Sequence, residues 1–248
     1  MNIQSHKRDR HPARRHFVSL AIVWTLLVLV IYAFAVHNER EAIIDTAGTA
    51  ARTAYEKDIV YRNWAAIHGG VYVPVSEAWP PNPYLDSPER DITTPSGRAL
   101  TLVNPAYMTR QVHEIFVRKT GIRTRLTSLA PLNPHNAPDD WEREALSRIA
   151  DGAAEVSGID SVAGTEVFRL MGRLVTEESC LACHAKQGYR LGDVRGGISV
   201  SLPMAPYWAV LRGQIARLSL TGVFVWLAGL GGLGLSTRRI GREMRRRA

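Results

Sequence analysis

Cysteine is nearly absent from this sequence, which has two among 248 residues. Both lie in ESCLACHAKQG at 177–187, where Cys180 and Cys183 are separated by two residues and His184 follows directly. A disulfide between them would contribute little, because loop-closure stabilisation grows with the number of residues enclosed. Three other uses remain for the motif: a redox dithiol, half of a zinc site, or attachment of a c-type haem.

Motifs of catalysis are also missing. The sequence contains no pair of carboxylates spaced for catalysis, no nucleophile beside a plausible base and no nucleotide-binding loop. It has no internal repeat and no low-complexity tract, and 46% of its residues are hydrophobic and 22% charged. This composition is typical of a globular chain. We therefore expect a folded protein that is not an enzyme.

Acidic residues are scarce only at the two ends. Of the net charge of +8, residues 1–16 supply +4, residues 237–248 supply +5 and Arg217 supplies +1, whereas residues 37–213 hold 19 basic and 21 acidic side chains. A nucleic-acid-binding domain would instead carry its basic residues on the folded domain. We therefore expect no nucleic-acid partner.

Charge is absent from two long stretches. Residues 17–36 and residues 218–236 are uncharged and predominantly apolar, and a helix needs about 20 such residues to cross about 30 Å of hydrocarbon. The small residues of the second stretch are common in membrane helices. We therefore predict two transmembrane helices rather than two buried core helices.

The basic ends orient these spans. Lys and Arg next to membrane segments prefer the cytoplasmic side, so residues 1–16 and 237–248 are predicted as cytoplasmic tails and residues 37–213 as a periplasmic domain. The expected location is a bacterial inner membrane. The AFA at 33–35 resembles a signal-peptidase site, but the preceding run is longer than usual, and a retained anchor is favoured.

The region between the spans mixes helices and strands. Apolar residues at helical spacing predict that the first helix continues through 38–66, either packed on its own domain or forming a dimer. The prolines of 77–97 predict a loop. Further helices are expected at 105–121 and 137–152, and strands at 69–75, 98–104, 122–128, 165–176 and 194–204. The fold class is therefore α+β, with the cysteine motif between the last two strands.

A covalently attached haem uses all three residues of the motif. A redox dithiol would need a surrounding βαβ pattern that is missing, and a structural zinc site needs four ligands. For haem, both thiols add to the vinyl groups and the adjacent imidazole binds the iron. The predicted export to the periplasm agrees, because this attachment occurs outside the cytoplasm. Haem c on Cys180, Cys183 and His184 is the favoured interpretation.

Five separated segments resemble the c-type haem, PAS-like periplasmic sensor domains of bacterial histidine kinases, cyclase-type signalling proteins and chemoreceptors. They are YRNWAAIHGGVYVPV, NPYL, LTLVNPAYMTRQVHEIF, LNPHNAPDDWE and CLACHAKQGYRLGDVRGGISVSLPM, within residues 40–207. The resemblance implies a PAS-like antiparallel sheet with a long N-terminal helix and a single haem. Only TRRIGREMRRRA follows the second span, so a separate partner would have to read the signal.

The sequence offers several candidates for the second axial ligand and for the partners of the propionates. The resemblance favours Met108 as a thioether ligand, with a core methionine beside the porphyrin as the alternative. His68 is a further candidate, although a histidine in this position is more often a satisfied pocket histidine than a ligand, and His113, Met171 and Met204 are the other candidates. The cations that could pair with propionates are Arg62, Arg110, Lys186 and Arg190, of which we predict Arg110 and Arg190 as site residues.

Two functions remain open at this stage. The first is a membrane-anchored sensor of redox state or a small gas, which signals through a partner such as a histidine kinase or a cyclase. The second is a membrane-anchored monohaem cytochrome with a redox partner. The near-heptad spacing in the first helix makes a homodimer a further expectation.

Overall fold

The computed structural model describes residues 11–247, and residues 1–10 of the predicted basic tail lie outside it. The chain divides into two compact units, the first made of residues up to Ile43 and from Tyr207 onwards, and the second of Ile44–Pro206. α1 (His11–Ile67) contributes to both units. The predicted continuation of the first helix beyond residue 36 is therefore confirmed.

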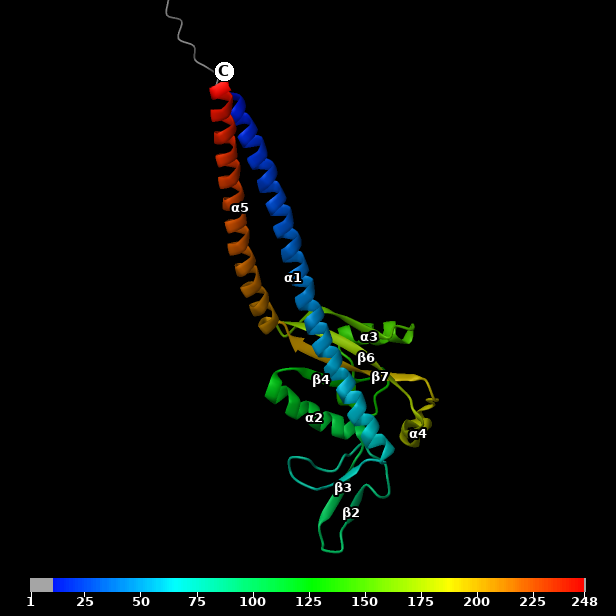
Figure 1. The fold of residues 1–248 in the computed structure, drawn as a ribbon. Coiled ribbons are helices and arrows are strands. Elements are labelled where there is room, and N and C mark those ends of the chain that lie inside the picture. Colours follow the sequence, from blue (N-terminus) through cyan, green and yellow to red (C-terminus); the bar gives the residue numbers. More distant parts are fainter. Residues whose placement is uncertain (1–10, 248) are drawn as a thin grey trace, which may run out of the picture. The chain divides into compact units, whose positions relative to one another are not determined.

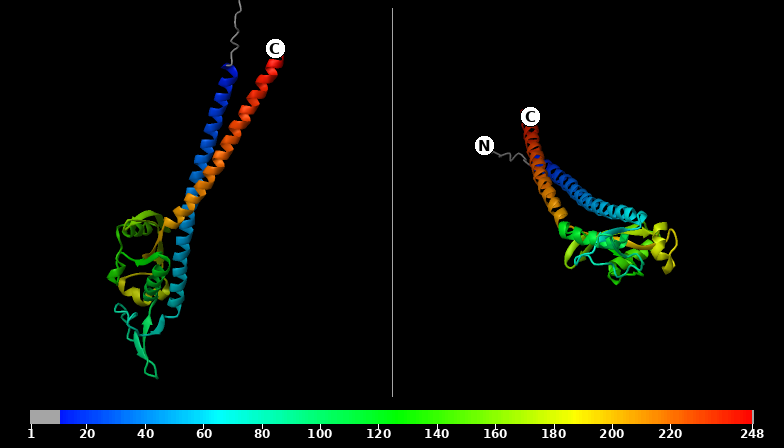
Figure 2. Two further views of the ribbon diagram at one scale, coloured as in Figure 1. Left: turned by 90° about the vertical axis from the view of Figure 1, so that its left-hand side faces the viewer. Right: turned by 90° about the horizontal axis from the view of Figure 1, so that it is seen from below.

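The first unit is a pair of helices, α1 and α5 (Ala205–Arg247), which contain both predicted spans. Within this unit the two helices lie side by side in Figure 1 and in the left view of Figure 2. Hydrogen bonds join them: Tyr32 Oη lies 2.7 Å from Ser219 Oγ, and the Trp24 indole donates to the Trp226 carbonyl at 3.2 Å. Polar groups paired across apolar helices are typical of membrane helix packing.

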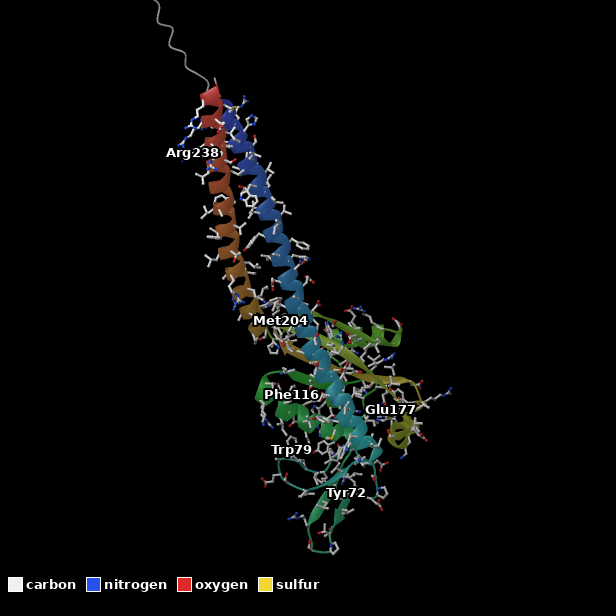
Figure 3. All side chains as sticks on the ribbon, in the orientation of Figure 1. Tyr72, Trp79, Phe116, Glu177, Met204 and Arg238 are labelled. Carbon is white, nitrogen blue, oxygen red and sulfur yellow. The ribbon has the colours of Figure 1, made fainter. Side chains whose placement is uncertain are left out.

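Both helices are long and apolar enough to cross a membrane, and their most apolar windows bury no residue. A core helix of a globular domain would bury such residues. Length and composition are nevertheless shared with signal sequences, and one of the helices lies near the N-terminus. Membrane crossing and the assignment of sides stay predictions. Figure 3 marks Arg238 near the end of α5, within the basic segment that follows the second span.

The second unit has two antiparallel sheets. β1 (Val71–Pro74), β2 (Asp91–Thr93) and β3 (Ala99–Val103) form a sheet in the order β1-β3-β2. β4 (Arg123–Thr127), β5 (Glu155–Val162), β6 (Thr165–Val175) and β7 (Val194–Pro203) form the other, in the order β4-β7-β6-β5. The α+β class is confirmed, but the strands divide between two sheets where one was expected, and α2 (Pro105–Thr120) connects the two sheets between β3 and β4.

α3 (Asp140–Ala150) and α1 pack on the larger sheet. Leu146 and Ile149 of α3 lie in one hydrophobic cluster with Met171 of β6. Tyr55 of α1 packs so closely on β6 that a Cβ at Gly172 would lie 2.3 Å from its ring. The part of α1 that follows the first apolar stretch thus packs on its own domain, as one of the two sequence interpretations stated.

Capping residues recognisable in the sequence mark the ends of α2 and α3. Pro105 opens α2 behind the Asn104 cap, and Gly121 closes it in a left-handed conformation. Asp139 caps α3 through a capping box with Glu142. The short strand β2 within the proline-rich loop and the whole of β5 were not predicted. α4 (Glu178–His184) carries the cysteine motif on the connection between β6 and β7, as expected.

Candidate functional site

The cysteine motif lies in a loop that is closed at its base by backbone hydrogen bonds. Thr176 donates its N–H to the Asp193 carbonyl at 2.8 Å and accepts from Gly192 N–H at 2.9 Å. Figure 1 shows α4 on this connection, and Figure 3 marks Glu177 at its start. Cys180 is half-buried, and the side chain of Cys183 lies outside the described residues.

The turn after α4 fixes the imidazole of His184. A 3₁₀-helix at Ala185–Gln187 follows directly, and in this geometry side chains three residues apart lie above one another. Gln187 Oε1 therefore comes within 2.6 Å of His184 Nδ1. The ring of Tyr189 stands edge-on to the imidazole, with centroids 6.2 Å apart.

A β-bulge brings Arg195 to the other nitrogen of this imidazole. Val175 pairs with Val194 and Leu174 with Gly196, so Arg195 is the extra residue on β7. Bulges of this kind redirect a side chain. The next residue must be glycine, because a Cβ at Gly196 would lie 2.4 Å from the Thr127 carbonyl oxygen. As a result, Arg195 Nη1 lies 2.8 Å from His184 Nε2.

This contact defines the tautomer of His184. A guanidinium donates hydrogen bonds and never accepts them, so Nε2 is unprotonated and accepts from Arg195, and Nδ1 carries the proton donated to Gln187. Burial lowers the pKa of His184 below its ordinary value of 6.5, and the charges of Arg195 and Arg62 lower the pKa further, against the Gln187 hydrogen bond. The imidazole is neutral at neutral pH, and Nε2 is its basic atom.

Two cavities adjoin at His184. One of about 320 Å³ reaches toward α2 and the proline-rich loop, and one of about 230 Å³ lies beside α1 and Cys180. Small-molecule sites in proteins span roughly 300–1,000 Å³. Both cavities share Arg62, Asn104, Ala106, Leu174, His184 and Arg195.

Arg62 is a buried cation on α1 beside these cavities. Its side chain is 5% exposed, and it donates to the Thr109 hydroxyl at 3.2 Å and the Pro105 carbonyl at 3.5 Å. Burial and repulsion from Arg195 lower the pKa of Arg62 to about 10, so it remains protonated at neutral pH. None of the ion pairs within the described part of the chain includes Arg62 or Arg195.

The structure brings some predicted site residues together and separates others. Arg110 lines the larger cavity, as does Lys186, which had been weighed as a propionate partner. Met108, His68 and Arg190 line neither cavity: Met108 is half-buried on α2, and His68 and Arg190 are exposed. Met171 and Met204 are fully buried.

Arg195 was missed by the sequence analysis. The signal available was its place in VRGG, where two glycines at the start of a strand suggest a bulge or a close backbone approach. The described residues contain no group of three or more His, Cys, Asp or Glu side chains that could hold a metal ion. That finding gives no support to a zinc site within the described part of the chain.

Comparison with known proteins gives one family and one solved structure. Residues 35–203 match the Tll0287-like family, Tll0287. The crystal structure of the cyanobacterial heme-protein Tll0287 is similar at 18% identity and a TM-score of 0.43, over 64% of this chain and 95% of that chain. No curated protein matches the sequence.

Proposed function

The chain belongs to the Tll0287-like family, and from this premise we propose that it is a membrane-anchored c-type haem sensor. Its domain at 37–213 would lie in the periplasm of a bacterium, and the basic tails in the cytoplasm. The sensed signal would be redox state or a small gas, read by a separate partner such as a histidine kinase or a cyclase. The protein would not itself be an enzyme.

The observation that carries the proposal is the position of His184. It follows Cys183 directly, and its unprotonated Nε2 lies where the two cavities adjoin. There Nε2 accepts a hydrogen bond from the cation Arg195. Neutral imidazole nitrogen is the form that binds iron, and the second ring nitrogen of such a ligand is normally hydrogen-bonded. The family name points the same way, since Tll0287 is a heme-protein.

The residues present fit a haem. Arg62 and Arg195 are cations without a carboxylate within ion-pair distance among the described residues, and Arg195 Nε is buried without a hydrogen-bond partner. A porphyrin bearing carboxylates and iron would satisfy both the cations and the imidazole. Cys180 and Cys183 would hold it through thioether bonds, and His184 Nε2 would bind the iron. The bound haem would supply reversible one-electron chemistry and a site for a diatomic ligand.

α2 is the element that could transmit a change at this site. Its buried polar contacts with α1 include the hydrogen bond from Arg62 to Thr109 and the pair Asp58–His113, in which Asp58 Oδ2 lies 2.6 Å from His113 Nε2. Met108 belongs to the same helix, and because it lines neither cavity, binding iron would require α2 to rearrange. A thioether prefers ferrous over ferric iron, so this rearrangement would follow the redox state and alter the packing against α1.

Absorption spectra of the oxidised and reduced full chain test the sensor against the alternative, a membrane-anchored electron-transfer cytochrome. We expect a ferric form that is wholly or partly high-spin and a ferrous form that is low-spin. Met108→Ala should leave ferrous iron five-coordinate and open to carbon monoxide, whereas Val112→Ala, on the same helix, should not. Low-spin spectra in both states that Met108→Ala leaves unchanged would contradict the sensor and favour a fixed six-coordinate cytochrome, with His68 or another residue as ligand.

A further inference from the structure

The charged side chains around the two cavities are predominantly basic. They are Arg62, Arg110, Arg173, Lys186 and Arg195, against the acidic Asp86 and Glu177. Asp86 is almost fully exposed and lies 3.5 Å from Lys186, and Glu177 accepts a hydrogen bond from Asn63 at 3.3 Å. Neither acidic group forms an ion pair with Arg62 or Arg195, and Asp58, whose charge acts on Arg62, is paired with His113.

These two arginines differ from ordinary surface cations. Arg62 is nearly buried, and each of its observed hydrogen bonds goes to a neutral oxygen. Arg195 donates a hydrogen bond from Nη1 to His184, and its Nε is buried without a hydrogen-bond partner. Arg195 is half-buried and its charge repels that of the buried Arg62, a cost that a bound anion would offset. We propose that Arg62 and Arg195 form a subsite for ionised carboxylate groups at the junction of the two cavities.

The carboxylates are either the propionates of the attached haem or those of a separate small ligand. Only the first source rests on the proposed function. A guanidinium matches a carboxylate through two parallel hydrogen bonds, and Arg62 and Arg195 together could hold a pair of carboxylates or grip one from two sides. Because Arg62 belongs to α1 and contacts α2, a carboxylate bound there would join the site to both helices.

Resonance Raman spectra of the full-length holoprotein test the first source. The propionate-bending band reports hydrogen bonding to the propionates, and we expect it to shift in Arg62→Met and in Arg195→Met. Arg118→Met is the matched control, since Arg118 is an exposed cation on α2 that lines neither cavity. If Arg62→Met fails to fold, Arg195→Met and the charge-preserving Arg195→Lys carry the test, and the lysine variant should shift the band less.

Thermal melting with added sodium acetate, compared with sodium chloride at equal ionic strength, tests the second source. Stabilisation by acetate that is lost in Arg195→Met would assign the subsite to a free carboxylate and would support it even in protein lacking haem. An unmoved band in both methionine variants, together with no acetate stabilisation of the wild type, would overturn the subsite. Retention of covalent haem in that case would leave the proposed function standing.

Discussion

His184 Nε2 accepts a hydrogen bond from Arg195 Nη1 at 2.8 Å, at the junction of two cavities. Because arginine cannot accept, the contact requires a neutral imidazole with its proton on Nδ1, directed at Gln187. The same tautomer is the one that presents Nε2 to a metal. The two hydrogen bonds thus keep His184 neutral, with Nδ1 directed at Gln187 and Nε2 directed at Arg195.

The cap of α3 gives a first prediction. Asp139 accepts from Glu142 N–H at 2.8 Å and from the buried Arg169 at 2.8 Å, so Asp139→Ala should lower the free energy of unfolding by about 0.5–2 kcal/mol. Urea denaturation measures the loss. Asp140→Ala is the control, because Asp140 is exposed and acts only through the helix dipole. Equal losses in the two variants would contradict the assigned cap.

The same residue sets a pH dependence. Burial raises the pKa of Asp139, but hydrogen bonds from Arg169 and the Glu142 backbone outweigh it, and the pKa lies below its ordinary value of 3.8. A depressed carboxyl pKa contributes stability that is present above the unfolded pKa and is lost as pH falls through the folded pKa. The difference between wild type and Asp139→Asn should therefore shrink below pH 3.8.

Local sequence signals predicted most elements of the second unit. Asn104-Pro105 and Gly121 bound α2 as caps, and Asp139 bounds α3. Such signals act within one turn of the chain, so they can be recognised without the tertiary structure.

β5 could not be recognised in the same way. It buries Val156 and little else, and its residues include glycine, serine and aspartate. The β5–β6 turn has positive φ at Ala163 (49°) and Gly164 (76°), as a two-residue hairpin turn requires. Asn-Gly is the usual sequence signal for this turn. Here alanine stands at the first position, so the turn could not be recognised from the sequence.

Arg195 illustrates what spacing along the sequence could not supply. Its contact with His184 depends on the unpaired position between Val194 and Gly196, which exists only once β6 and β7 pair. Distance from the motif in sequence does not decide which cations line the cavities: Lys186 lines one and Arg190 neither, whereas Arg62, from the distant α1, lines both.

Close packing of the first unit gives a further prediction. A Cβ at Gly229 would lie 2.2 Å from the Trp24 indole, whereas a Cβ at Gly231 would meet nothing within 4 Å. Gly229→Ile should therefore separate α1 from α5 and lower the melting temperature of the detergent-solubilised protein, and Gly231→Ile should not. An unchanged melting temperature in Gly229→Ile would contradict the packing of Trp24 against α5.

The orientation of the spans can be tested with reporter fusions. A reporter after residue 15 and one at the C-terminus should behave as cytoplasmic, and one inserted near Pro81 as periplasmic. The reason is that Lys and Arg cluster between each span and the nearer end of the chain. A periplasmic C-terminus would overturn the assignment of sides.

Covalent haem is the central claim, and intact mass spectrometry of the exported, denatured protein tests it most directly. The wild type should carry the added mass of one haem, and Cys180→Ala with Cys183→Ala should carry none. His184→Ala should keep the mass and change the spin state of the iron, since the proximal imidazole sets the ligand field. A wild-type chain at its unmodified polypeptide mass, after expression with a functional haem-attachment system, would contradict the account.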